Sequence, residues 1–368
     1  MSRASIAKGT STPKHPFQLR GETWRYVVRR TVREFAADGC ADTAAGLTFF
    51  SVLSIFPAGL AVVASLGLIG GGESVVRRLF GILEQVAPGS AVDTLRDPIT
   101  GFAESDLAGL TFFVALATAI WSASIYVGAF GRALNRIYGV AEGRPYWKRK
   151  PAQVALTVLL LLLVGVVAAI VVLSGPVARA VGEALSIGEV ALDAWNVVRW
   201  PVLFLAVVAM VSVLFKGTSN VRQPPFAWVV LGALSAIVVF ALASAGFAFY
   251  VSNFASYDRT FGTLAGTVIF LLWLFLINLA LLLGAEFNAE TLRGQQLQGG
   301  MPSEERTKLV LRDTAVIERT ERAEQVTKQR GALLRRGVPL PPRDDTPFRR
   351  AVRSVQRAWL RVRRRSSR

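Results

Sequence analysis

The 27 residues from Ala44 to Gly70 carry no charged side chain. As a helix, this stretch would be about 40 Å long at about 1.5 Å per residue, which exceeds the about 30 Å of a bilayer's hydrocarbon core. A cleaved signal peptide has a shorter apolar region, of about 7–15 residues, nearer the start of the chain. The stretch therefore predicts a retained first transmembrane helix.

Apolar stretches recur along the chain, and basic residues gather between and after them. The five further stretches are 107–128, 152–174, 197–215, 226–250 and 264–285. Hydrophobic residues make up 52% of the sequence although the formal net charge is +17, so the apolar and charged residues must occupy different environments. The pattern predicts an all-α polytopic membrane protein with six transmembrane helices.

The distribution of Lys and Arg predicts the orientation, because short basic loops resist translocation. Residues 1–43 contain eight of them, residues 129–151 six, and the tail from residue 286 twenty. The segments 71–106 and 175–196 contain only three and one. Both termini are therefore expected in the cytoplasm, with the spans in a bacterial inner membrane.

The spans divide the chain into three expected parts: an N-terminal cytoplasmic segment 1–43, a transmembrane domain 44–286 and a basic cytoplasmic tail 287–368. In both cytoplasmic parts an apolar helix face lies beside arginines, which is typical of an interfacial amphipathic helix. Contacts with lipid headgroups are expected at Arg29, Arg30, Arg349, Arg350, Arg353 and Arg357. The expected partner is the anionic lipid of the cytoplasmic leaflet.

Pro57 lies near the middle of the first expected span. Its ring removes one backbone donor and collides with the carbonyl of Leu53. Neighbouring helices, or the hydroxyls of Ser51 and Ser54, can repair such a break and leave a static kink. The alternative is a hinge or interrupted helix that faces a cavity, as in many transporters. The residues leave both interpretations open.

Two spans differ in the packing that they predict. The stretch 154–175 is apolar on every face, which favours a peripheral helix with much lipid contact. In the fifth span, Gly232 and Ala236, and then Ala241 and Ala245, are four residues apart. Small residues at this spacing allow close helix contact, so this helix is expected to be central.

The residue types give no basis for an enzyme. A single Cys40 and a single His15 exclude an intrachain disulfide and do not suggest a Ser-His-Asp or Cys-His centre or a His/Cys metal site. The basic tail has the charge to bind RNA, but hydrolysis needs a base, an acid or a metal near the phosphate. We expect no catalytic residues, no metal, no cofactor and no nucleic-acid partner.

Three stretches carry a family resemblance: AAGLTFFSVLSIFPAGL, ALNRIYGVAEGRPYWKRK and YDRTFGTLAGTVIFLLWLFLINLALLLGAEFNAE. They resemble the YihY/BrkB family of bacterial inner-membrane proteins, formerly labelled ribonuclease BN, over about residues 25–295. The resemblance implies a six-helix membrane protein without an established activity. Where many members have Pro-Asn after the fourth span, this chain has KGTSNVRQPP, with Asn220 in the neighbouring place.

The resemblance and the polar residues near the spans together give the candidate pathway or structural residues. They are Pro57, Arg132, Asn135, Arg136, Asn220, Tyr257, Gly262, Trp273, Asn278, Glu286 and Asn288.

Each candidate also has a structural interpretation. Asn135 either caps its helix or joins Arg132 and Arg136 at an anionic headgroup. Glu286 either pairs with an arginine of a cytoplasmic loop or takes part in proton coupling. The aromatic candidates are either packing or interfacial residues.

Two functions are compatible with these features. Transport or handling of a lipid or amphiphile is the leading one, and a non-transporting scaffold or envelope-integrity factor is the alternative. A transporter needs a polar-lined cavity between the first, second, fifth and sixth spans, whereas a scaffold has a closed bundle. The sequence names no substrate.

Overall fold

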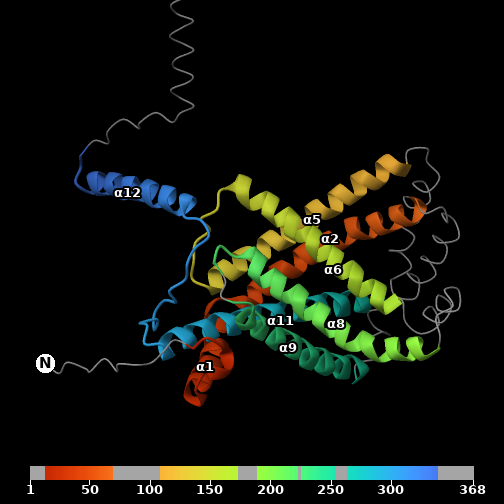
Figure 1. The fold of residues 1–368 in the computed structure, drawn as a ribbon. Helices are drawn as coiled ribbons and strands as arrows, with labels where there is room; N and C mark the ends of the chain where they lie inside the picture. Colours follow the sequence, from red (N-terminus) through yellow and green to blue (C-terminus); the bar gives the residue numbers. More distant parts are fainter. Residues whose placement is uncertain (1–12, 69–107, 173–188, 223–224, 254–262, 339–368) are drawn as a thin grey trace, which may run out of the picture. The chain divides into compact units, whose positions relative to one another are not determined.

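The computed structural model describes residues 13–68, 108–172, 189–222, 225–253 and 263–338, and every regular element within these ranges is helical. A short 3-10 helix, η1, covers Pro16–Gln18. The α-helices are α1 (Gly21–Ala37), α2 (Cys40–Leu68), α5 (Ala108–Ile137), α6 (Tyr146–Val172), α8 (Glu189–Thr218), α9 (Phe226–Asn253), α11 (Thr263–Gln298) and α12 (Ala315–Arg335) (Figure 1).

Within the described ranges, four helices are long and apolar enough to cross a membrane, and they match the third to sixth expected spans. These segments are Tyr146–Val167, Asp193–Thr218, Phe226–Val251 and Gly266–Gln298. The first and second expected spans coincide with α2 and α5, which are helical over 29 and 30 residues. Within α2 the helix continues through Pro57 to Leu68. The all-α, multi-pass class is therefore confirmed.

The helices pack in pairs. Figure 1 shows α2 beside α5 and α9 beside α11, and these pairs share the most extensive contacts. The helix α1 packs against α11, whereas α8 contacts both α6 and α9. All of these helices belong to one compact unit, residues 1–316, and a second unit that contains most of α12 begins at Ile317.

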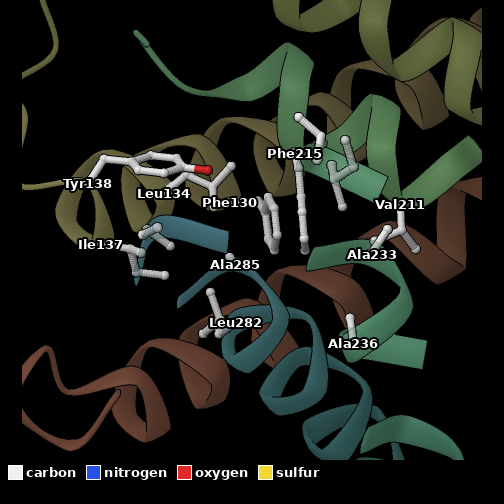
Figure 2. Packing of buried hydrophobic residues seen from close by; sticks show 14 of the residues in the cluster. Phe130, Leu134, Ile137, Tyr138, Val211, Phe215, Ala233, Ala236, Leu282 and Ala285 are labelled. Atoms are coloured by element: carbon white, nitrogen blue, oxygen red, sulfur yellow. The ribbon is translucent and has the colours of Figure 1, made fainter. Parts of the chain in front are cut away.

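The buried core is built mainly from residues of α2, α5, α8, α9 and α11. The rings of Phe130 and Phe215 are stacked with their centroids 6.0 Å apart, and Leu134 and Leu282 are fully buried beside them (Figure 2). Lipid tails are as apolar as leucine, so helix association in a membrane depends on such close packing. The core thus fixes α5 and α11, which carry candidate residues, beside α8.

The packing expectations for α6 and α9 have different outcomes. The lipid-facing character of α6 is confirmed, because Leu159, Leu162 and Val166 are exposed. Close contact at Gly232 is also confirmed, since a Cβ atom there would lie 2.6 Å from the Cβ of Asn288. The expectation for Ala241 and Ala245 was wrong, since both are exposed. Only one half of α9 is therefore a packing surface.

Candidate functional site

A cavity of about 560 Å³ lies among the six long helices of the first unit. Its lining includes Ser54 of α2, Val127 of α5, Leu160 of α6, Met210 of α8, Phe240 of α9 and Trp273 of α11. Pockets for small ligands are typically about 300–1,000 Å³. The cavity is thus large enough for a ligand, and it lies between the helices at which a transporter would need one.

The serine and threonine hydroxyls of the cavity lining are turned back onto their own helices. Ser51 and Ser54 of α2 donate to the carbonyls of Leu47 and Phe50 at 3.0 and 2.8 Å. Thr157 of α6 donates to the carbonyl of Gln153 at 2.8 Å. The bundle is therefore neither closed, as expected of a scaffold, nor provided with the polar-lined cavity expected of a transporter, because the surface offered to a ligand is almost entirely hydrocarbon.

A polar node joins three helices beside the cavity. The Tyr126 hydroxyl of α5 donates to Asn278 Oδ1 of α11 at 2.9 Å. The amide of Asn278, only 1% exposed, donates to Thr48 Oγ1 of α2 at 3.3 Å and to the carbonyl of Leu274 at 2.9 Å. Such interhelical bonds are worth about 0.6 kcal/mol on average in a membrane. Asn278 therefore holds α2, α5 and α11 in register.

Two other candidates on α11 contact neighbouring helices. Trp273 lines the cavity and meets Phe240 of α9 edge to face, with centroids 6.2 Å apart. Asn288 donates to the Tyr138 hydroxyl at 2.9 Å, while its Oδ1 has no hydrogen-bond partner among the described residues. Trp273 thus belongs to the cavity, and Asn288 fastens α11 to the end of α5.

Asn135 and Asn220, which are 85 residues apart, meet directly. The backbone N–H of Asn220 donates to Asn135 Oδ1 at 2.8 Å. The Asn135 amide in turn donates to Glu142 Oε2 at 3.0 Å. Asn135 is buried, whereas Arg132 and Arg136 are exposed on the same helix. The side chain of Asn135 therefore neither caps its helix nor joins the two arginines, but connects two loops.

Glu142 and Arg144 complete this polar cluster. The Arg144 guanidinium donates to both carboxylate oxygens of Glu142, at 2.8 and 2.9 Å, and to the carbonyl of Thr218 at 2.7 Å. Burial alone would raise the pKa of the Glu142 carboxyl, but the hydrogen bonds from Arg144 outweigh it and lower the pKa. The pair is thus held in its charged form, at the point where α5 and α8 end.

Residues 309–316, here called the strap, lie across the same loops. Asn220 donates to the carbonyl of Asp313 at 3.0 Å and accepts from its N–H at 3.2 Å. Arg312 donates to the carbonyls of Val221 and Lys216. Lys148 pairs with Asp313 at 3.0 Å, and hydrogen bonds from the Ala315 N–H and from Lys148 lower the pKa of that carboxyl.

The expected ion pair lies one turn beyond Glu286. Glu286 is 1% exposed, and its Oε2 has no hydrogen-bond partner among the described residues. Glu290 instead pairs with Arg30 of α1 at 2.9 Å and with Arg293 at 3.0 Å. Arg30 thus connects α1 to α11. An ion pair was one of the two roles considered for Glu286. The structure shows one at Glu290 instead, because Glu290 lies on the face of α11 that meets α1.

The remaining candidates divide between exposed and undescribed positions. Arg29 is exposed on α1. Tyr257, Gly262, Arg349, Arg350, Arg353 and Arg357 lie outside the described residues, as does the side chain of Pro57. In the described part of the chain, no group of three or more His, Cys, Asp or Glu side chains is arranged to hold a metal ion.

Sequence reasoning missed several residues that the structure brings to these sites. Tyr126 and Thr48 complete the node at Asn278, and both could have been noticed as hydrogen-bonding groups inside apolar stretches. Glu142 and Asp313 lie in polar segments. Nothing in the sequence distinguishes them there from charged residues that are simply in contact with solvent. Their roles depend on partners far away in the chain.

In comparisons with known proteins, residues 31–307 match the model of a family described as virulence factor BrkB. The ribonuclease-like protein YfkH of Bacillus subtilis is 29% identical over 67% of this chain and 87% of its own length. A UPF0761 membrane protein of Alkalilimnicola ehrlichii is 30% identical over 73% of this chain, but the match spans only 60% of that relative. No solved structure matches the chain significantly.

Proposed function

Since the chain belongs to the virulence factor BrkB family and is a multi-pass bacterial membrane protein, we propose that it binds the hydrocarbon chain of a membrane lipid or similar amphiphile inside its helix bundle. Binding of this kind serves transport or lipid handling and requires no catalytic residues. The apolar cavity carries the proposal.

The chemistry of the cavity supports a hydrocarbon ligand over a polar solute. A polar solute would lose its hydration and find few free donors or acceptors, because Ser51, Ser54 and Thr157 already bond to their own helices. Each buried methylene group contributes about 0.8 kcal/mol relative to water. A scaffold without a ligand is the alternative, and nothing in the cavity lining favours it.

The proposal includes six membrane spans, with α2 and α5 as the first two and with both termini cytoplasmic. A cysteine at Ser74 or Ser186 in a Cys40→Ala background should react with an impermeant thiol reagent added outside intact cells. A cysteine at the exposed Glu305 should not react unless the cells are opened. Labelling with the opposite sidedness would overturn this topology.

Filling the cavity tests the proposed ligand. We expect Ala123→Phe to lower cross-linking by a photoreactive acyl chain to the cavity-lining peptides, since the added phenyl ring takes up part of the space that the chain would fill. The measurement uses purified protein in lipid nanodiscs, ultraviolet cross-linking and peptide mass spectrometry.

Ala117→Phe is the matched control, because Ala117 lies in the same helix but is exposed. It should leave cross-linking to Leu160 and Ile277 unchanged. If the unsubstituted protein gives no cross-links to the cavity lining, the cavity holds no lipid chain and the scaffold becomes the better explanation.

A further inference from the structure

Lys150, in the second turn of α6, has an unusual set of neighbours. Its Nζ donates to Ser124 Oγ of α5 at 2.6 Å and lies 4.1 Å from the centre of the Trp121 ring. Ser124 itself donates to the carbonyl of Trp121 at 2.6 Å, so its lone pairs face the ammonium. Among the described residues no carboxylate pairs with Lys150. Its position is therefore fixed, but its charge is not neutralised.

The residues around Lys150 are those found at the headgroup level of a membrane. Trp121 and Trp147 are 55% and 64% exposed, and Tyr146 is exposed beside them. The Arg149 guanidinium lies 5.9 Å from the centre of the Tyr146 ring. Exposed Trp and Tyr residues mark the membrane interface, and basic residues there attract anionic lipids. Two cations, Lys150 and Arg149, therefore lie beside side chains of the kind that marks this interface.

A row of contacts between α5 and α6, here called the seam, runs from Lys150 towards the cavity. On α6, Lys150, Gln153 and Thr157 follow at helical spacing, so they share one face. The Gln153 amide lies against Gly128 of α5, and Thr157 lines the cavity. Lys150 and Thr157 are seven positions apart, which corresponds to about 10 Å along the helix axis. On the α5 side, Ala123 lines the cavity immediately beside Ser124.

We propose that Lys150 and Arg149 bind the phosphate of an anionic phospholipid whose acyl chain enters the cavity between α5 and α6. The inference rests on the proposed function and narrows its substrate class to lipids with a negatively charged phosphate headgroup. Charge complementarity selects the headgroup, because the ammonium and the guanidinium are both without a carboxylate partner within the described ranges. The apolar cavity accepts the chain without selecting among headgroups.

The test compares photoreactive phosphatidylglycerol with photoreactive phosphatidylcholine carrying the same acyl chain, in nanodiscs of full-length protein. The unsubstituted protein should give more cavity cross-links with phosphatidylglycerol. Lys150→Gln should reduce this preference about fivefold, the effect of one basic residue near an anionic surface. Lys308→Gln removes the same charge at an exposed position outside the seam and should leave the preference unchanged.

The outcomes separate this inference from the proposed function. An unchanged preference in Lys150→Gln, with cavity cross-links retained, overturns the headgroup site but leaves the chain-binding cavity. Displacement of phosphatidylglycerol by inorganic phosphate alone would also overturn it, because the site would then bind free anions. Loss of all cavity cross-links in the unsubstituted protein would instead contradict the proposed function.

Discussion

Replacing Gly143 with alanine is expected to detach the strap and to lower the free energy of unfolding by about 3 kcal/mol, the upper end for overpacking. The new Cβ would overlap the carbonyl of Asp313 and lie 2.9 Å from Asn220 Nδ2. The clash is with backbone, so no flexible side chain can relieve it. The hydrogen bond from the Val316 N–H to the Gly143 carbonyl would be lost with it.

Limited trypsin digestion and thermal unfolding in detergent measure this effect. In the native protein, the Arg312 N–H donates to the Asn220 carbonyl, so cleavage after Arg312 should be slow. Gly143→Ala should accelerate it. Gly165→Ala is the control, because a Cβ at Gly165 meets open space and the substitution suits a helix. Unchanged protection in Gly143→Ala would show that the strap does not depend on this contact.

Truncating Glu290 to alanine is expected to loosen α1 and to cost about 3 kcal/mol of unfolding free energy. The Glu290 carboxylate is almost completely buried and pairs with Arg30 at 2.9 Å and with Arg293 at 3.0 Å. Without it, two partly buried guanidinium groups lose their counter-charge. Removal of one partner from a buried ion pair is costly because the other charge stays desolvated.

Thermal unfolding and thiol labelling test this result. A Val27→Cys probe in a Cys40→Ala background should be protected, since Val27 is fully buried, and Glu290→Ala should expose it. The control is Glu318→Ala, which removes the exposed pair between Glu318 and Arg322 at 3.8 Å. Exposed pairs contribute about 0–1 kcal/mol, so little should change. Equal effects of the two substitutions would refute the role assigned to Glu290.

The sequence and the family resemblance singled out candidate residues, but they did not indicate most of the partners of those residues. Asn135 and Asn220 were each identified, yet the hydrogen bond between them joins positions 85 residues apart. An ion pair was one of two roles considered for Glu286, and the fold gives an ion pair to Glu290. One helical turn separates the two, and the sequence does not say which turn meets α1. Hydrogen bonds and ion pairs form only when the distance between two atoms is right to within a few tenths of an ångström. A sequence pattern does not determine distances that closely.

The sequence by itself determined that the chain is helical and crosses a membrane several times, because the length and hydropathy of a span are local properties. The tertiary structure decided which helix faces meet protein and which meet lipid. Gly232 packs against α11 whereas Ala241 is exposed, although both belong to small-residue pairs in the same helix. The reason is that lipid tails and the bundle interior are equally apolar, so hydrophobicity cannot distinguish them. The cavity, which is bounded by six helices, exists only once their packing is fixed.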